Sequence, residues 1–296
     1  MTDAGRYAKL GFDPPFEVVE PARLAAPLVF NSPHSGSIYP QAFLSQSKLD
    51  ALTLRRSEDA FVDELFLPCV SLGAPLLRAN FPRAYLDLNR EPYELDPQMF
   101  AGKLPEFVNM RSLRVAVGLG TIPRVVADAQ PIYRNPVRVE DALERIDALY
   151  HPFHTQLRRL LERAHDRFGV AVLIDCHSMP SNQADAGGVD VVLGDRYGSS
   201  AGLGIVDRLE QSLRAQGYRV RRNKPYAGGF IPEHFGAPAR GFHAVQIEIA
   251  RALYMDERRI AKLDGWKEAR DHLFAAARDL VAKLDGPRID WPLAAE

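Results

Sequence analysis

The chain has 296 residues, of which 46% are hydrophobic and 25% are charged, a composition typical of a globular protein with a large core. The formal net charge of −1 and the pI of about 6.7 argue against nucleic acid as a main partner. Two cysteines are too few for a disulfide framework, the first residues lack the apolar core of a signal peptide, and no apolar run approaches the roughly 18 residues of a membrane helix. We therefore expect a cytoplasmic protein with no membrane partner.

The first half of the chain is predicted to hold short strands and one helix. Residues 1–26 are rich in Pro and Ala and are expected to form an irregular lead-in to a single domain covering 1–296. A helix is predicted from Ser57 to about Ser71, with Ser57 as its N-cap and with Glu58 and Asp59 in its acidic first turn. Short strands are predicted at 28–31, 75–80 and 84–88, followed by a weakly periodic stretch over 91–135 that is rich in Pro, Gly and Arg.

The second half alternates helices with strands more regularly. Apolar residues keep three- and four-residue spacing from Val139 to Phe168, which predicts the longest amphipathic helix. Further strands are predicted at 170–174, 189–193, 218–221 and 244–250, and further helices at about 200–216 and 257–284. This alternation is typical of the α/β class with a mixed, mainly parallel central sheet.

Two of the predicted strands run directly into a histidine. The segment LVFN leads into Ser32, Pro33 and His34, and the segment VAVLI leads into Asp175, Cys176 and His177. The carboxyl ends of strands in an open α/β sheet meet where ligands bind, and imidazole is a common zinc ligand. The pattern therefore indicates a shared metal or catalytic centre.

A catalytic zinc ion needs a third protein ligand. Asp59 and Glu58 are the best placed, because they follow His34 at the start of the next predicted helix. Asp175 is too close in sequence to His177 to be the first choice, and it is instead expected to accept a hydrogen bond that orients an imidazole. Which of the two neighbouring acids is the ligand stays open from the residues alone.

One acid and several arginines complete the candidate residues. Glu248 lies in the strand AVQIEIA, where it either faces solvent or points into a site as a general base. Arg83 and Arg90 flank Asp87 and Asn89 in RAYLDLNR, and Arg134 follows in the irregular stretch. Guanidinium groups bind carboxylates through two parallel hydrogen bonds, so this composition suits hydrolysis of an acidic amide, although any single arginine is as readily a surface residue.

Six segments together resemble the N-formylglutamate amidohydrolase family over roughly residues 27–260. They are NSPHSG, the EDAFVDEL helix, RAYLDLNR, DCHSMPS, GGFIPEHFG and AVQIEIARALYMDE, and they occur in the family's order. The resemblance implies a three-layer fold like that of the zinc carboxypeptidases, and a metal amidohydrolase that cleaves N-formyl-L-glutamate to formate and glutamate in histidine degradation.

The resemblance also implies roles for individual residues. His34, Asp59 and His177 become the expected ligands of Zn²⁺ or of another divalent ion such as Co²⁺, with Glu58 as the alternative to Asp59. Glu248 is expected to act as general base, and Arg90 to stabilise the oxyanion. Further candidates for contact with the acidic N-acyl substrate are Arg83, Asn89 and Arg134. Two other possibilities stay open, a hydrolase of another N-acyl amino acid or small peptide and a non-catalytic binder of an acidic metabolite.

Overall fold

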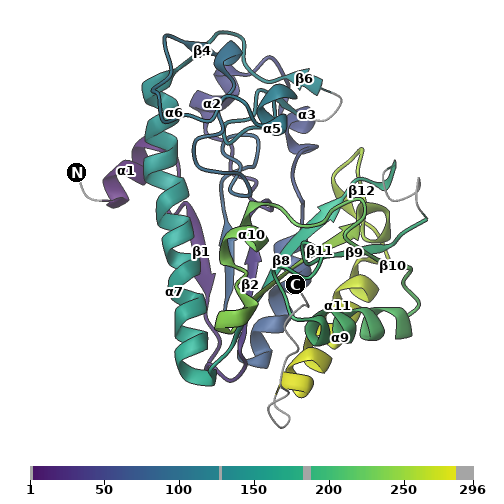
Figure 1. The fold of residues 1–296 in the computed structure, drawn as a ribbon. Coiled ribbons are helices and arrows are strands. Elements are labelled where there is room, and N and C mark those ends of the chain that lie inside the picture. Colours follow the sequence, from purple (N-terminus) through teal and green to yellow (C-terminus); the bar gives the residue numbers. More distant parts are fainter. Residues whose placement is uncertain (1–2, 127–128, 183–187, 285–296) are drawn as a thin grey trace. The chain divides into compact units, whose positions relative to one another are not determined.

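The computed structural model describes residues 3–126, 129–182 and 188–284 (Figure 1). Within these ranges the chain forms two compact units. The first comprises residues up to 17, 33–60 and 78–156, and the second comprises 18–32, 61–77 and residues from 157 onward. The prediction of a single domain over 1–296 stays a prediction, and it includes residues 1–2, 127–128, 183–187 and 285–296, which lie outside the described residues. No helix in the described part of the chain is long and apolar enough to cross a membrane.

A seven-stranded sheet has the order β1-β3-β2-β8-β11-β9-β10. The strands β2, β8 and β11 run parallel to one another, whereas β9 runs antiparallel to β11 and parallel to β10. The predicted mixed, mainly parallel sheet is therefore confirmed. Its strands are β1 (Phe16–Val19), β2 (Leu28–Ser32), β3 (Leu76–Ala79), β8 (Ala171–Met179), β9 (Val191–Gly194), β10 (Val220–Arg222) and β11 (Phe242–Ala250).

The second unit also contains helices that pack against this sheet, as the α/β class requires. The longer described helices are α1 (Asp3–Leu10), α6 (Val139–Arg145), α7 (His151–Phe168), α9 (Leu203–Ala215) and α11 (Trp266–Leu284). The shorter ones are α2 (Gln41–Gln46), α3 (Ala51–Arg55), α4 (Val62–Phe66), α5 (Leu113–Ala116) and α10 (Phe230–Phe235). A π-helical turn over Ile146–Tyr150 joins α6 to α7, so the predicted helix over 139–168 is confirmed.

The two faces of β8 and β11 differ sharply in character. Phe30, Ile174 and Ile247 line a small cavity together with apolar residues of α4, α9 and α11, so this face belongs to the core. Because side chains alternate along a strand, the residues between them face the opposite side. That opposite face carries Asn31, Asp175, His177, Gln246 and Glu248, which are all buried. An apolar face therefore anchors the strands while the polar face is available for chemistry.

Three sequence predictions were wrong in their boundaries or their type. The helix predicted over 57–71 begins only at Val62, because Phe61 adopts a left-handed conformation with φ 66°; before it, the Asp59 N–H donates to the His34 carbonyl (3.0 Å). The strand predicted over 84–88 is a turn, held by the Asp87 N–H donating to the Thr121 carbonyl (2.8 Å). The final helix begins at Trp266, after a small hairpin, β12 (Met255–Asp256) and β13 (Ala261–Lys262).

The lead-in and the irregular stretch contain more structure than predicted. Residues 3–10 form α1 and residues 16–19 form β1, whereas the sequence predicted no element there. Short strands also occur in and after the stretch 91–135. Each has two residues, and they pair to form two small two-stranded sheets. They are β4 (Phe100–Ala101) with β7 (Val137–Arg138), and β5 (Val125–Val126) with β6 (Gln130–Pro131).

Candidate metal centre

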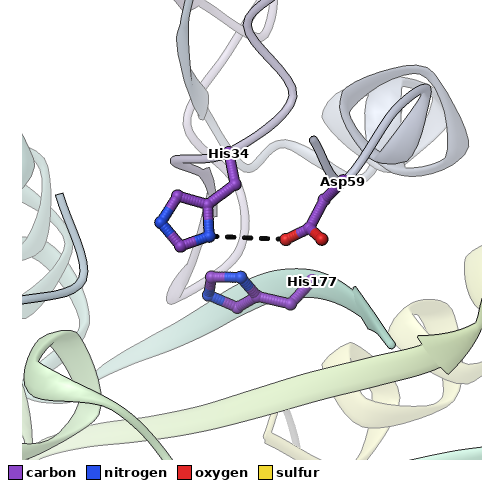
Figure 2. A group of neighbouring side chains, drawn as sticks. All are labelled: His34, Asp59 and His177. Atoms are coloured by element: carbon purple, nitrogen blue, oxygen red, sulfur yellow. Dashed lines mark ion pairs between the residues drawn. The ribbon is translucent and has the colours of Figure 1, made fainter. Parts of the chain in front are cut away.

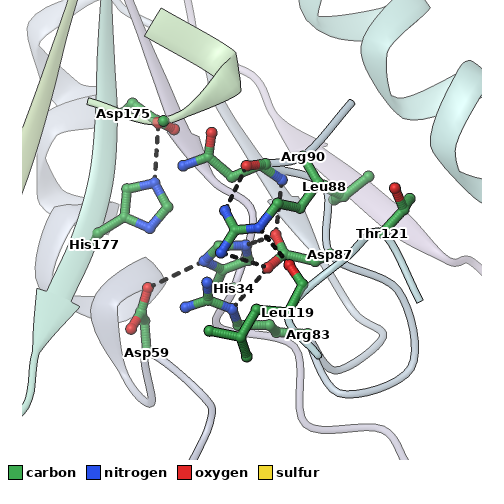
Figure 3. A network of polar contacts seen from close by, with 12 residues as sticks. His34, Asp59, Arg83, Asp87, Leu88, Arg90, Leu119, Thr121, Asp175 and His177 are labelled. Atoms are coloured by element: carbon green, nitrogen blue, oxygen red, sulfur yellow. Dashed lines mark hydrogen bonds and ion pairs between the residues drawn. The ribbon is translucent and has the colours of Figure 1, made fainter. Parts of the chain in front are cut away.

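His34 follows β2 after a single proline and is 1% exposed. The turn behind it requires Gly36, because a side chain there would meet the Phe81 carbonyl oxygen at 2.1 Å. The imidazole Nε2 lies 2.8 Å from Asp87 Oδ1, and a dashed line in Figure 3 marks this contact. An ionised carboxylate only accepts hydrogen bonds, so Nε2 is the donor, and in the neutral imidazole the lone pair is then on Nδ1. The chain thus fixes the tautomer in which Nδ1 of His34 is a potential ligand.

Asp87 also binds two arginines. Its Oδ2 accepts from Arg83 Nε at 3.0 Å and lies 3.6 Å from an Arg90 nitrogen, and its Oδ1 accepts from the Asn89 N–H at 2.9 Å. Burial on its own would raise the pKa of this carboxyl group, but Arg83, Arg90 and His34 outweigh it and hold the pKa well below its usual range. Asp87 is therefore an ionised acceptor at neutral pH.

Arg90 is a buried cation whose position is fixed. Its Nε donates to the Leu119 carbonyl (2.8 Å) and one terminal nitrogen donates to the Asn89 carbonyl (2.7 Å), while the Arg90 carbonyl accepts from the Tyr150 hydroxyl (2.6 Å). Burial lowers the pKa of Arg90 to about 10, against the opposing effect of Asp87. The guanidinium therefore keeps its charge at neutral pH, beside the carboxylate that binds His34 (Figure 3).

The two neighbouring acids proposed as third ligand have different surroundings. Asp59 is buried, and its Oδ2 lies 3.4 Å from Nδ1 of His34. Glu58 is equally buried, but Arg55 Nε lies 3.1 and 3.2 Å from its two oxygens, and one of these also accepts from the Tyr39 hydroxyl at 2.7 Å. The geometry therefore favours Asp59 as the acid that acts with His34, and it gives Glu58 a structural ion pair.

His177 lies on β8 with a carboxylate two residues before it. Its Nε2 lies 2.9 Å from Asp175 Oδ2, and Asp175 Oδ1 accepts from Asn31 Nδ2 at 2.7 Å. The carboxylate again makes Nε2 the donor, so in the neutral imidazole Nδ1 carries the lone pair. Residues two apart on a strand share a face, which is why Asp175 can reach the imidazole that follows it. Asp175 thus does for His177 what Asp87 does for His34.

Glu248 lies beside His177 in the sheet. The parallel register of β11 with β8 pairs Glu248 with His177 and Gln246 with Asp175, so all four side chains share the polar face. Glu248 is 7% exposed, which excludes the alternative that it faces solvent. Gln246 donates to it through Nε2 at 2.8 Å.

His34, Asp59 and His177 form one buried group (Figure 2). One ligand atom from each lies within 4.8 Å of the other two. Two ligand atoms bound to one tetrahedral zinc ion at roughly 2.0–2.2 Å lie about 3.3 Å apart, close to the 3.4 Å between His34 Nδ1 and Asp59 Oδ2. Two neutral imidazoles and a carboxylate are also a donor set that catalytic zinc sites use. The residues therefore fit a divalent transition metal.

Of the remaining candidates, Asn89 takes part in these contacts through its backbone, whereas none of the contacts described above involves Arg134. Arg134 is exposed, and its backbone N–H donates to the Gln46 carbonyl. Asn89 is buried and immediately precedes Arg90 in the chain. Asp87 and Gln246 had no role in the sequence-based hypothesis. The sequence did contain a signal for each. Asp87 lies between two arginines, and Gln246 precedes a glutamate of the same strand by two residues.

Comparisons of the sequence and of the fold with known proteins point to a single family. A family model described as N-formylglutamate amidohydrolase matches residues 26–255. N-formylglutamate deformylase of Pseudomonas putida is 29% identical over 78% of this chain and 82% of that protein, and the Pseudomonas aeruginosa deformylase is 30% identical over 81% and 86%. The crystal structure of N-formylglutamate amidohydrolase from Ralstonia eutropha JMP134 superposes with a TM-score of 0.86 at 35% identity, covering 91% of this chain and 98% of that one.

Proposed function

Since the chain belongs to the N-formylglutamate amidohydrolase family, we propose that it is a metal-dependent enzyme that cleaves N-formyl-L-glutamate to formate and L-glutamate. The observation that carries the proposal is the buried group of His34, Asp59 and His177. Each imidazole of this group has its Nε2 next to a buried carboxylate, Asp87 or Asp175. Carboxylates in this position orient the ring and increase its basicity as a ligand.

The proposed metal is Zn²⁺ or a similar divalent ion such as Co²⁺, with Nδ1 of each histidine and a carboxylate oxygen of Asp59 as ligands. When bound, such an ion polarises a carbonyl oxygen and makes water acidic near neutral pH. The donor set supports zinc rather than magnesium or calcium, because imidazole suits zinc and those two ions prefer oxygen ligands. Glu58 is the less favoured ligand, because Arg55 and Tyr39 already bind its carboxylate.

Glu248 is the proposed general base. It is a buried carboxylate on the polar face of β11, opposite His177 in the register of the sheet. In the proposed reaction a carboxylate oxygen of Glu248 takes a proton from the attacking water and later delivers it to the departing amine of glutamate. The C–N bond of the formamide breaks, and the proton that Glu248 returns leaves with the amino group.

The arginines are the proposed partners of the substrate's negative charges. Arg90 is buried, charged and fixed by two carbonyl groups, which suits stabilisation of an oxyanion without reorganisation. Arg83 and Asn89 are proposed to contact a substrate carboxylate from the same loop, and Arg134 from the exposed segment that follows. Arg83 is about one quarter exposed, so part of it is accessible to a ligand.

The deciding experiment measures formate release from N-formyl-L-glutamate by purified protein, before and after chelation and after return of zinc or cobalt. We expect release that chelation abolishes and metal restores. A panel of N-formyl, N-acetyl and dipeptide substrates would then define specificity. Metal binding without release from any N-formyl substrate would contradict the proposed reaction, and release that is insensitive to chelation would contradict the proposed metal.

Glu248→Gln tests the general base in the same assay. The substitution keeps the size of the side chain, so we expect metal content to stay unchanged while kcat falls about 10²–10⁴-fold, the usual contribution of an acid–base group. A kcat close to that of the original protein would remove Glu248 from this role.

A further inference from the structure

Gln246 links a glycine-rich loop to the proposed general base. Its Oε1 accepts from the Gly229 N–H at 2.9 Å, and its Nε2 donates to Glu248 Oε1 at 2.8 Å. Gln246 and Glu248 are both buried and lie two residues apart on β11, so they share one face of the strand. The proposed reaction as described assigns no role to Gln246 or to the loop.

The local sequence builds this loop closely against the sheet. Gly194 ends β9 and is the register partner of Gln246 on β11. A side chain at position 194 would meet the Ala227 carbonyl carbon and the Gly228 nitrogen at 2.8 Å. Gly228 has φ 115°, a conformation that a residue with a side chain rarely adopts. The glycines thus let the loop approach β11 and bring the Gly229 N–H to Gln246.

The direction of the Gln246 amide follows from its partner. A backbone N–H can only donate, so the oxygen of the Gln246 amide must face Gly229. The –NH₂ group must then face Glu248, and the Glu248 oxygen that receives it must be an acceptor. The backbone therefore determines which end of the amide faces Glu248, and the amide restricts rotation of the Glu248 carboxylate.

We propose that Gln246 is a positioning residue that acts through Glu248, holding its carboxylate in the orientation from which it accepts a proton. The inference rests on the proposed function, because it needs Glu248 as general base. It assigns the GGF segment, Gly228–Phe230, a role in the orientation of that base. Misplacement of a reacting group by about 1 Å can cost roughly 10²-fold in rate, so such a residue has a measurable effect without contact with substrate.

The test is a double-mutant cycle between Gln246→Met and Glu248→Gln in the metal-loaded, full-length protein. Methionine has nearly the shape of glutamine, but its sulfur is only a weak acceptor for the Gly229 N–H and has no hydrogen to donate to Glu248. We expect Gln246→Met to lower kcat for N-formyl-L-glutamate about 10- to 100-fold with KM and metal content unchanged. In the Glu248→Gln background, the same substitution should leave the residual kcat unchanged.

The matched control is Ile247→Met, the neighbouring position on β11 whose side chain packs on the apolar face. It introduces the same residue into the same strand, so it reports the effect of a disturbed strand alone. We expect its kcat to stay within about twofold of that of the unsubstituted protein, because exchanges between apolar side chains of similar volume are well tolerated. Amide hydrogen exchange gives a readout besides activity. Peptides containing Gly229 should lose protection in Gln246→Met and retain it in Glu248→Gln.

The possible results separate this inference from the proposed function. If the original protein releases no formate, or Glu248→Gln is fully active, the proposed function or the general base is wrong. If Glu248→Gln is impaired but Gln246→Met is not, the positioning role is overturned. Equal losses of kcat from Gln246→Met in both backgrounds would also overturn it, because a residue that acts through Glu248 has no effect once that carboxylate is absent.

Discussion

Replacement of Asp87 by asparagine should weaken metal binding although Asp87 is not a proposed ligand. Asp87 Oδ1 lies 2.8 Å from His34 Nε2 and is ionised, so it fixes the tautomer that exposes Nδ1. An asparagine can present its –NH₂ group to Nε2 and so favour the opposite tautomer, with the proton on Nδ1. Loss of such an outer partner typically weakens metal affinity about 10- to 100-fold, which corresponds to about 1.4–2.7 kcal/mol.

The same substitution should also lower stability, because it removes the charge that faces Arg83 and Arg90. Breaking a buried ion pair costs about 3–5 kcal/mol of unfolding free energy. Because Arg83 is partly exposed to solvent, we expect a loss of about 3 kcal/mol or less. Metal affinity must therefore be measured on folded protein. A competition titration of zinc against a chromophoric chelator, at a temperature well below the unfolding midpoint of both variants, separates affinity from stability.

Asp96→Asn is the matched control for Asp87→Asn. Asp96 is also a buried acid paired with an arginine, with its Oδ2 at 2.6 Å from Arg124 Nε. Unlike Asp87, it has no hydrogen bond or ion pair with His34 or His177 among the residues that the structure describes. We expect Asp96→Asn to lower the unfolding midpoint and leave the zinc dissociation constant unchanged. Unchanged zinc affinity in Asp87→Asn, or equal weakening in both variants, would refute the argument that Asp87 prepares His34 as a ligand.

Three further predictions use the same protein and assays. Asp59→Asn should weaken zinc affinity by more than about 100-fold, whereas Glu58→Gln should lower the unfolding midpoint and keep the metal; the reverse pattern would make Glu58 the ligand. Arg134→Met should raise KM for N-formyl-L-glutamate without a change in the unfolding midpoint, because Arg134 is exposed, and an unchanged KM would exclude it from the substrate site. Burial lowers the pKa of His243 to about 4 from its ordinary 6.5, so between these values the unfolded chain binds more protons than the folded protein. The contribution of His243 to the free energy of unfolding should therefore fall by about 3 kcal/mol on acidification from pH 7 to pH 4, and His243→Asn should remove that part of the dependence in denaturant titrations.

The strands that carry the site could be predicted because their signals are local. Apolar runs bounded by polar residues marked 28–31, 170–174 and 244–250, and the structure has β2, β8 and β11 there. The helix over 57–71 failed for the opposite reason. Its first residues have acceptable helical composition, but the Asp59 N–H donates to the His34 carbonyl, 25 residues earlier in the chain, and Phe61 adopts a left-handed conformation with φ 66°, through which a right-handed helix cannot pass.

The two carboxylates that orient the histidines show where sequence reasoning stops. Asp175 precedes His177 by two residues on a strand, so the alternation of side chains already places both on one face, and a role beside the imidazole could be predicted. Gln246 and Glu248 have the same spacing, and the same argument would have paired them. Asp87 lies 53 residues from His34, in a turn that was predicted as a strand, and no periodicity relates the two. Only the tertiary structure brings that acid to the imidazole, because the Thr121 carbonyl and the Arg83 and Arg90 guanidinium groups fix the turn in which Asp87 lies. The sequence predicted that the arginines of RAYLDLNR bind a substrate. In the structure, Arg83 and Arg90 also bind Asp87, the acid that orients the proposed metal ligand His34. Replacement of either arginine can therefore lower activity through lost substrate binding or through lost metal binding, and a metal titration separates the two causes.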